Sequence, residues 1–317
     1  MKKYFIIILF NYFLLGDYSG GFPGSNFHYG SNAREIALSK STLSTYSTGF
    51  NSFINPALLP NIDNNEYGFS HFIMSLDRSI QALSISRPLP PSAGVSLSFF
   101  KSGTDNIMET SLDFGDVIGN ISHSEGFGML SFGINLGSLS AGFNIKAYFN
   151  NLDNYSGNGI GFDLGALYTV NKNINLALKL NNISAGYSWD IDSEKYDEDI
   201  LQNHSIGLSY NNNDNLLITS QIDFLPITID SNTHESDIFE IYRLGFEYRL
   251  NSFNNNKFPI ILRSGIRNNQ INTFTSFGFG IPIEINNKLI LNIDYAIDPG
   301  LVNEGISHLF SFTILNY

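Results

Sequence analysis

The sequence predicts an all-β protein: a fourteen-stranded antiparallel transmembrane β-barrel of the bacterial outer membrane. Three observations predict this fold. Segments of about ten residues alternate between polar and apolar side chains, the polar faces carry charges of both signs, and the connections alternate between short and long. A chain of 317 residues is long enough for one large β structure of this kind.

The composition excludes several classes of protein. Lys plus Arg number 17 against 29 Asp plus Glu, a net charge of −12, so the chain is a poor ligand for nucleic acid, whose phosphates require cationic contacts. The absence of cysteine excludes disulfides, thiol catalysis, iron–sulfur clusters and a lipoprotein anchor. A hydrophobic content of 43% excludes intrinsic disorder. Beyond the N-terminus no run approaches the ~20 apolar residues of a spanning helix.

Residues 1–20 predict a signal peptide that exports the chain. Lys2 and Lys3 form a short cationic start, and an apolar run from Phe5 to Leu15 follows it. The run is short for a transmembrane anchor. No Ala-x-Ala cleavage site is present, which leaves the small residues Gly16, Ser19 and Gly20 as candidates.

Residues 21–65 differ from the rest of the chain and predict a separate N-terminal segment. Residues 33–38 favour one or two helical turns with Ser31 or Asn32 as the N-cap. Asn55, Pro56 and Ala57 then predict a rigid turn. Two interpretations of this turn stay open: an ordinary turn before the first strand, or a hatch that closes the lumen.

Residues 66–317 contain the segments that predict the barrel. Ten to twelve residues is about twice the length of a strand in a soluble sheet and suits a tilted strand that crosses a bilayer. The expected strands are 66–76, 79–88, 93–102, 126–136, 139–150, 157–170, 173–184, 203–211, 215–224, 239–250, 258–268, 272–283, 287–296 and 306–316.

Connection lengths predict which end of the barrel faces the periplasm. The connections after even-numbered strands are short and are expected to be periplasmic, whereas those after odd-numbered strands are mostly long and extracellular. Residues 107–114 are strand-like, but an extra spanning strand would give an odd total. We therefore assign them to an extracellular loop, together with 185–202 and 225–238.

Period two assigns the charged residues to the lumen. On 139–150, Phe143 and Ile145 share the apolar face, so Lys146 lies on the opposite face. The same reasoning places Asp163, Arg243 and Glu247 inside the barrel. A turn centred near residues 153–154 pairs Asp163 with Asn144, diagonally from Lys146. We therefore predict a contact between Lys146 and Asp163 in the lumen.

The sequence offers no active site, so we expect a protein that is not an enzyme and has no cofactor. Asp190, Asp192 and Glu194 are weak candidates for calcium ligands, and a solvated acidic loop is the favoured interpretation. Gly157, Gly159 and Gly161 resemble a dinucleotide-binding loop, but they open a strand without a following helix. Small residues on a lumenal face explain them better.

Three parts of the chain carry a resemblance to a known family. They are Ala33-Arg34 through Asn55-Pro56-Ala57-Leu58; Gly142-Phe143-Asn144-Ile145-Lys146 with Gly161-Phe162-Asp163-Leu164-Gly165 and Asn181-Asn182-Ile183; and Ile293-Asp294-Tyr295-Ala296 with the end from His308 to Tyr317. In their order and spacing the chain resembles the PorV/PorQ group of outer-membrane proteins, within the FadL-like barrel class. It departs from that pattern at Leu38-Ser39-Lys40, where the family has Gly-Gly-Ala, and before Asn55, where an acidic pair is missing.

The resemblance implies a fourteen-stranded barrel with its N-terminal segment folded into the lumen. It also implies a part in export of proteins to the cell surface by type IX secretion, with secretion-machinery subunits, secreted cargo proteins and outer-membrane lipid as partners. The alternatives are a FadL-like channel for hydrophobic compounds or a purely structural barrel. A channel would need a lateral opening, which Pro88, Pro90 and Pro91 would create by interrupting strand pairing. Phe310, Phe312 and Tyr317 partly match a barrel-assembly signal.

Overall fold

A computed structural model describes residues 22–111, 115–191, 194–212, 215–230, 235–250, 259–286, 288–299 and 306–316. The predicted signal peptide at 1–20 lies outside the described residues, as do Asp192 and Tyr317.

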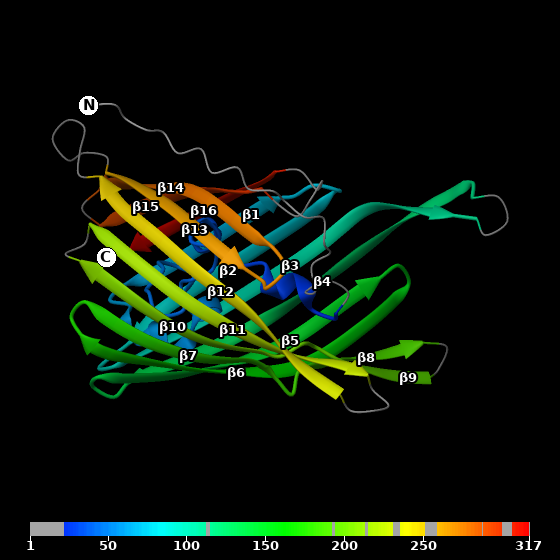
Figure 1. Cartoon of the computed structure of the whole chain (residues 1–317), viewed down its shortest axis with the longest axis horizontal. Helices are drawn as coiled ribbons and strands as arrows, with labels where there is room; N and C mark the ends of the chain where they lie inside the picture. The colour runs from blue at the N-terminus through cyan, green and yellow to red at the C-terminus, as the bar shows by residue number, and fades with distance from the viewer. Residues whose placement is uncertain are drawn as a thin grey trace.

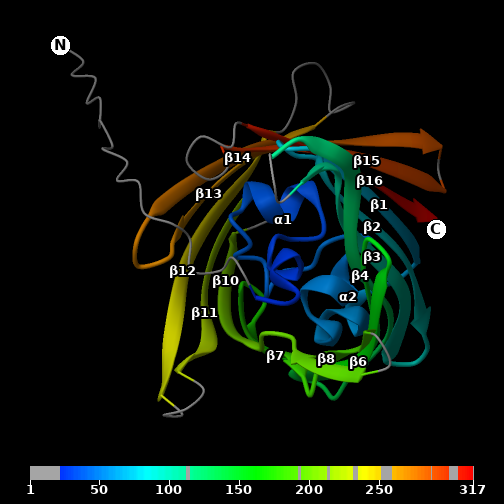
Figure 2. The same cartoon turned by 90° about the vertical axis from the view of Figure 1, so that its right-hand side faces the viewer.

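Fourteen strands form a closed antiparallel ring in the described part of the chain (Figures 1 and 2). Consecutive strands pair around it, and β1 closes it against β16 from Asn65 with Asn316 to Ile73 with His308. The strands of the ring are β1 (Asn65–Ile73), β2 (Arg78–Leu89), β3 (Ala93–Thr110), β4 (Val117–Asn135), β5 (Leu139–Leu152), β6 (Tyr155–Asn171), β7 (Ile174–Ile183), β10 (Asn203–Asn212), β11 (Leu216–Asp230), β12 (Glu235–Leu250), β13 (Ile260–Asn268), β14 (Thr273–Asn286), β15 (Leu289–Asp298) and β16 (Ser307–Asn316). The predicted fold class is confirmed, and each expected strand overlaps one strand of the ring.

Three segments that were expected to be extracellular loops contain strand instead. Residues 107–110 belong to β3, which pairs with β4 beyond the edge of the ring, so the loop assigned to 107–114 is wrong there. Residues 185–202 contain the hairpin β8 (Gly186–Ile191) and β9 (Glu194–Asp199). Residues 225–230 and 235–238 lengthen β11 and β12. In β3–β4 and β11–β12 the antiparallel pairing of the ring continues past its edge, whereas β8 and β9 pair with each other as a separate hairpin.

The expected interruption at the prolines is also wrong. The pairing of β2 with β3 runs without a break from Arg78 with Thr104 to Leu89 with Ala93, and Pro88 pairs with Gly94. Proline is tolerated here because it lies at the last turn of the strand pair, where the lost N–H matters least.

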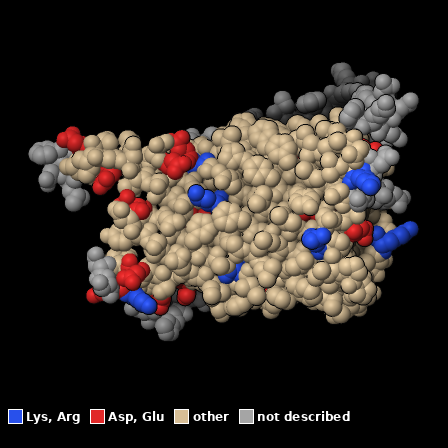
Figure 3. Space-filling view, turned by 180° about the vertical axis from the view of Figure 1, so that it is seen from behind, with Lys and Arg blue, Asp and Glu red and all other residues tan. Residues whose placement is uncertain are grey.

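Side chains alternate around the ring as period two predicts. On β5, Phe143 and Ile145 are each 41% exposed on the outer face, whereas Asn144 and Lys146 are 0% and 5% exposed on the inner face. Figure 3 shows the result on one side of the molecule: a broad surface with few charges, and acidic residues gathered on the projections at one end. An apolar outer band of this kind suits lipid.

The N-terminal segment lies inside the ring (Figure 2). It contains η1 (Ser25–His28), α1 (Ala33–Ala37), α2 (Asn51–Ile54) and η2 (Pro56–Asn61). Asn32 caps α1, because its side-chain oxygen accepts the backbone N–H of Glu35 at 2.9 Å. No helix among the described residues is long and apolar enough to span a bilayer. We call residues 22–62 the plug.

A row of four glycines makes room for the plug. Gly94, Gly133, Gly142 and Gly165 pair in register across β3, β4, β5 and β6. A β-carbon on any of them would overlap atoms of Asn55, Pro56 or Leu59. The backbone of these strands can therefore lie directly against the turn that begins η2. The plug packs there because the four glycines have no side chains.

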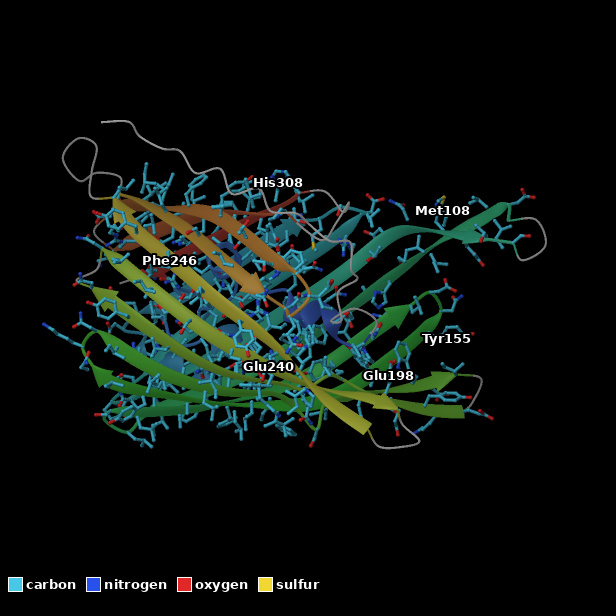
Figure 4. The ribbon with its side chains drawn as sticks, viewed as in Figure 1. Met108, Tyr155, Glu198, Glu240, Phe246 and His308 are labelled. Atoms are coloured by element: carbon cyan, nitrogen blue, oxygen red, sulfur yellow. The ribbon has the colours of Figure 1, made fainter. Side chains whose placement is uncertain are left out.

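The outer face provides the first test of the fold. Phe246 lies on β12, is 43% exposed on the outer face, and is shown in Figure 4. Replacing Phe246 with Arg in protein refolded into lipid vesicles is expected to lower the free energy of unfolding by about 2–4 kcal/mol, since a cation near the bilayer midplane loses its hydration. Urea titration measures this change. Phe246→Leu is the control and should stay within about 1.5 kcal/mol of the parent; equal losses in both variants would contradict the assigned face.

Candidate functional site

The lumen contains three groups of buried ion pairs, which contact the plug through hydrogen bonds or, at Arg34, through an ion pair. In the first, Asp163 on β6 lies between two lysines. Its carboxylate is 2.9 Å from Lys146 Nζ on β5 and 3.9 Å from Lys179 Nζ on β7. The first contact is the one expected from the sequence, and Asn144 pairs with Asp163 in the expected register. Asp163 is 0% exposed, so this is a charge without water contact.

Hydrogen bonds connect this group to the plug. Lys179 Nζ donates to the carbonyl oxygen of Phe53 at 2.6 Å, and Asn144 donates to that of Ser52 at 3.2 Å. Asn182, at the end of β7, accepts from Lys146 and donates its backbone N–H to Asp163 at 3.0 Å. The plug and three strands therefore share one polar network, in which Asp163 is the central anion.

A second group lies farther around the ring, on β11 and β12. Arg243 on β12 pairs with Asp223 on β11 at 2.6 Å and also donates to the carbonyl oxygen of Ser39 at 3.0 Å. Gln221 and Ser205 each donate to the same carboxylate at 2.7 Å. These bonds satisfy Asp223 fully and hold the chain that follows α1.

The third group forms a chain of four alternating charges. Arg34 of the plug pairs with Glu247 on β12 at 2.8 Å, and Arg263 on β13 bridges Glu247 and Asp294 at 2.6 Å each. All four residues that the sequence placed in the lumen, Lys146, Asp163, Arg243 and Glu247, therefore take part in an ion pair on the inner face.

The turn at Asn55, Pro56 and Ala57 fastens the plug in a different way. The Asn55 amide oxygen accepts the N–H of Ala57 at 3.0 Å. Its amide nitrogen donates at 3.3–3.4 Å to the carbonyl oxygens of Leu43, Ala166 and Leu178. A side chain of the plug thus reaches backbone atoms of β6 and β7, so this turn is an integral part of the packing inside the barrel.

Above the plug, toward the end with the projecting hairpins, the lumen is lined by aromatic rings. Phe27 and Phe53 of the plug pack with Phe100 on β3 and Phe127 on β4, with ring centroids 5.1–6.5 Å apart. Tyr148 on β5 and Tyr187 on β8 extend the group, with centroids 6.2 Å apart. We call these six residues the aromatic cluster. Lys146 Nζ lies 4.9 Å from the centre of the Phe127 ring, where a cation is stabilised by the ring face.

Among the described residues, cavities lie at several places along the lumen. One of about 70 Å³ is bounded by the aromatic cluster on one side and by Lys40, Lys146 and Lys179 on the other. Two larger ones, of about 260 and 330 Å³, lie on the other side of the plug. Both of these are lined by Arg34, Tyr46, Glu247 and Arg249. The plug therefore separates the aromatic cluster from a polar vestibule.

The acidic residues of the β8–β9 hairpin do not converge on a common point. Asp190 pairs with Lys195 across the hairpin, and Glu194 accepts the Tyr196 hydroxyl at 2.5 Å. No group of three or more metal-ligating side chains occurs among the described residues, and Asp192 is not one of those. Gly159 and Gly161 instead provide room for this hairpin, since their β-carbons would overlap Gly186 and Ala185.

Phe310 and Phe312, two of the three residues of the expected barrel-assembly signal, are exposed on the outer face of β16. They are 39% and 37% exposed, and the third residue, Tyr317, lies outside the described part of the chain. Their position is that of aromatic residues facing lipid.

Sequence reasoning missed the aromatic cluster. Tyr148 follows Lys146 by two residues, so period two already placed it inside, and Phe127 shares the parity of the inward Ser131. Both residues were overlooked because apolar side chains of a barrel strand are expected to face lipid. Phe27 and Phe53 carry no periodic signal, because they lie in η1 and α2, which are only four residues long each.

Comparison with solved structures identifies the fold. The CymD monoaromatic hydrocarbon channel aligns with a TM-score of 0.65 at 10% identity, over 91% of this chain and 98% of that one. The Pseudomonas putida toluene transporter TodX aligns with a TM-score of 0.64 at 12% identity, over 91% and 99%. A Pseudomonas aeruginosa FadL homologue gives 0.58 at 11% identity, over 90% and 98%. The chain thus has the same barrel fold as these structures. No family model and no curated protein matches the sequence.

The Asp163 network makes a prediction about stability. Replacing Asp163 with Asn leaves two ammonium groups buried without their shared anion, which is expected to lower the free energy of unfolding by about 3–5 kcal/mol. Lys146→Met should lower the free energy of unfolding less, because Asp163 still has Lys179 as an ion-pair partner. Urea titration of the two variants in the same detergent measures the order, and a larger loss for Lys146→Met would contradict the central position of Asp163.

Proposed function

We propose that this protein is an outer-membrane channel for small hydrophobic compounds, closed by the plug. The observation that carries the proposal is the aromatic cluster inside the lumen. A water-filled pore is lined by polar side chains. Three of its six residues, Phe100, Phe127 and Tyr148, lie at inward positions of ring strands, where a polar lumen would have polar side chains. The plug and the β8–β9 hairpin contribute the other three, and a site of this composition favours apolar ligands.

The arrangement along the lumen supports a path for such compounds. The cluster lies toward the end of the barrel that carries the β3–β4 and β8–β9 hairpins (Figure 1). We assign this end of the barrel to the cell exterior, because extracellular connections are the long ones. Tyr187 of the β8–β9 hairpin belongs to the cluster, so the hairpin reaches into the lumen. Because the pairing of β2 with β3 is unbroken, the proposed path runs along the lumen and not through a lateral opening, past the plug and into the two cavities of about 260 and 330 Å³.

The plug is held in a way that permits movement. Its polar contacts with the wall include the ion pair of Arg34 with Glu247 and the hydrogen bonds of Asn55 to strand carbonyls. It also packs on the glycine row, which has no interlocking side chains, and through apolar residues such as Phe27 and Phe53. None of these contacts belongs to the hydrogen-bonded ring of strands, so the plug can be displaced without breaking the ring, and this is the hatch role that the sequence left open.

The names of the structural neighbours agree with this class of ligand. CymD is described as a monoaromatic hydrocarbon channel and TodX as a toluene transporter. At 10–12% identity the likeness concerns the fold, so the choice of ligand rests on the aromatic cluster of this chain.

A role in type IX secretion, which the resemblance to the PorV/PorQ group predicts, is the second candidate. The β3–β4 hairpin favours it, because it projects beyond the ring and exposes Met108 and Val117, 68% and 60% exposed, where a protein partner could bind (Figure 4). The compared channels give this role no support, so we rank it below the channel. Deleting the gene and measuring surface delivery of secreted proteins would test it.

The hatch role is tested by filling the glycine row. Gly142→Val adds a side chain where Pro56 now lies and is expected to displace the plug and raise the conductance of single channels in planar bilayers several-fold. Gly128→Val is the matched control, because a β-carbon at Gly128 meets no atom within 4 Å. Equal conductance in the parent and in Gly142→Val would refute a plug that closes the lumen.

The ligand class is tested on the aromatic cluster. Phe127→Ala is expected to slow uptake of a monoaromatic hydrocarbon across the outer membrane of a host strain about tenfold, because each lost ring removes about 1–1.5 kcal/mol of contact. Phe143→Ala, on the outer face of the neighbouring strand, should leave uptake unchanged. Uptake is followed as accumulation of the labelled compound, and a rate independent of Phe127 would count against the channel.

A further inference from the structure

The cavity of about 70 Å³ between the plug and the wall has an excess of buried positive charge. Its lining contains Lys40 of the plug, Lys146 on β5 and Lys179 on β7, together with Glu35 and Asp223. The partners of these groups are Asp163, shared by the two wall lysines, and Arg243, paired with Asp223. The set therefore has four cations and three anions, an excess of one positive charge.

Lys40 is the cation that lacks a counter-ion. Its ammonium donates to the carbonyl oxygen of His28, and no carboxylate of the described residues lies within 4.0 Å of it. Glu35 is engaged elsewhere, accepting from the backbone and the hydroxyl of Ser31 at 2.8 and 2.9 Å. Burial lowers the pKa of Lys40 to about 8, so the group still carries its charge at neutral pH.

Two further polar atoms at the same cavity have unused hydrogen-bonding capacity. His28 Nε2 and Asn181 Oδ1 are both buried and have no hydrogen-bond partner among the described residues. Burial also lowers the pKa of His28 to about 3, so its ring is neutral and one of its nitrogens carries a proton. With Nε2 protonated, the ring would donate into the cavity. Buried groups of this kind are expected to bind a ligand or water.

From this geometry we infer that the cavity is a binding site for one small monovalent anion, a halide or a formate-sized carboxylate, held jointly by Lys40 and His28 of the plug and by Lys146 and Lys179 of the wall. A volume of about 70 Å³ suits such an ion with a few waters, since roughly 10–15 Å³ seats one water. A monoanion also neutralises the excess charge. Because plug and wall each contribute ligands, occupancy stabilises the seated plug, whether or not the barrel passes hydrophobic compounds.

Thermal unfolding of the purified full chain in detergent tests the site. Sodium chloride, bromide and formate are compared with gluconate, which is too large for the cavity, at one ionic strength and pH 7. The three small anions are expected to raise Tm by about 2–4 °C with saturation. Lys40→Met should remove this rise, and Lys288→Met, at an exposed turn, should keep it.

Equal Tm values in all four salts, or an undiminished rise in Lys40→Met, would overturn the site. If Lys40→Met does not fold, bromide-soaked crystals of the parent protein decide the matter through anomalous scattering. A bromide peak between Lys40, Lys146 and Lys179 supports the site, and a cavity without one overturns it.

Discussion

The structure depends on closure of the strand ring. In a bilayer every backbone N–H and C=O must be satisfied within the protein, and a sheet can do this only when its first and last strands pair. The pairing of β1 with β16 over all nine residues of β1 meets this requirement. Once the ring is closed, its circumference fixes the volume of the lumen, and the plug must fill that volume. The packing of the interior is therefore a consequence of closure.

The plug is held by several kinds of contact with different energetics. Against the glycine row the plug packs backbone on backbone, which depends on shape and excludes water. Phe27 and Phe53 add aromatic packing against Phe127, and the ion pair of Arg34 with Glu247 adds a charged contact. A buried ion pair adds little net stability, because desolvation offsets the attraction, but its partners cannot be separated without a penalty. Such an ion pair favours one arrangement of the plug over others without adding much net stability.

The aromatic cluster and the lysines that adjoin it give the lumen two chemically different surfaces at one level. The rings of Phe100 and Phe127 present an apolar face, while Lys146 and Lys179 present a charged one. Lys146 belongs to both, since its ammonium lies over the Phe127 ring and beside Asp163. A rearrangement of the plug would disturb both surfaces together, because Phe27, Phe53 and Lys40 all belong to it. The position of the plug therefore affects the apolar and the charged surface through the same few side chains.

The sequence alone determined the barrel, its strands and the faces of its charged residues. Period two needs only the local alternation of side chains, so this pattern was enough to place Lys146, Asp163, Arg243 and Glu247 on the inner face. The short turn at 153–154 even determined the register of Asn144 with Asp163, because a hairpin register follows from its turn. Only the tertiary structure decided the rest. Segments that are distant in sequence meet across the lumen to form the contacts of the plug, the row of four glycines and the cavity at Lys40. Local periodicity does not predict such contacts.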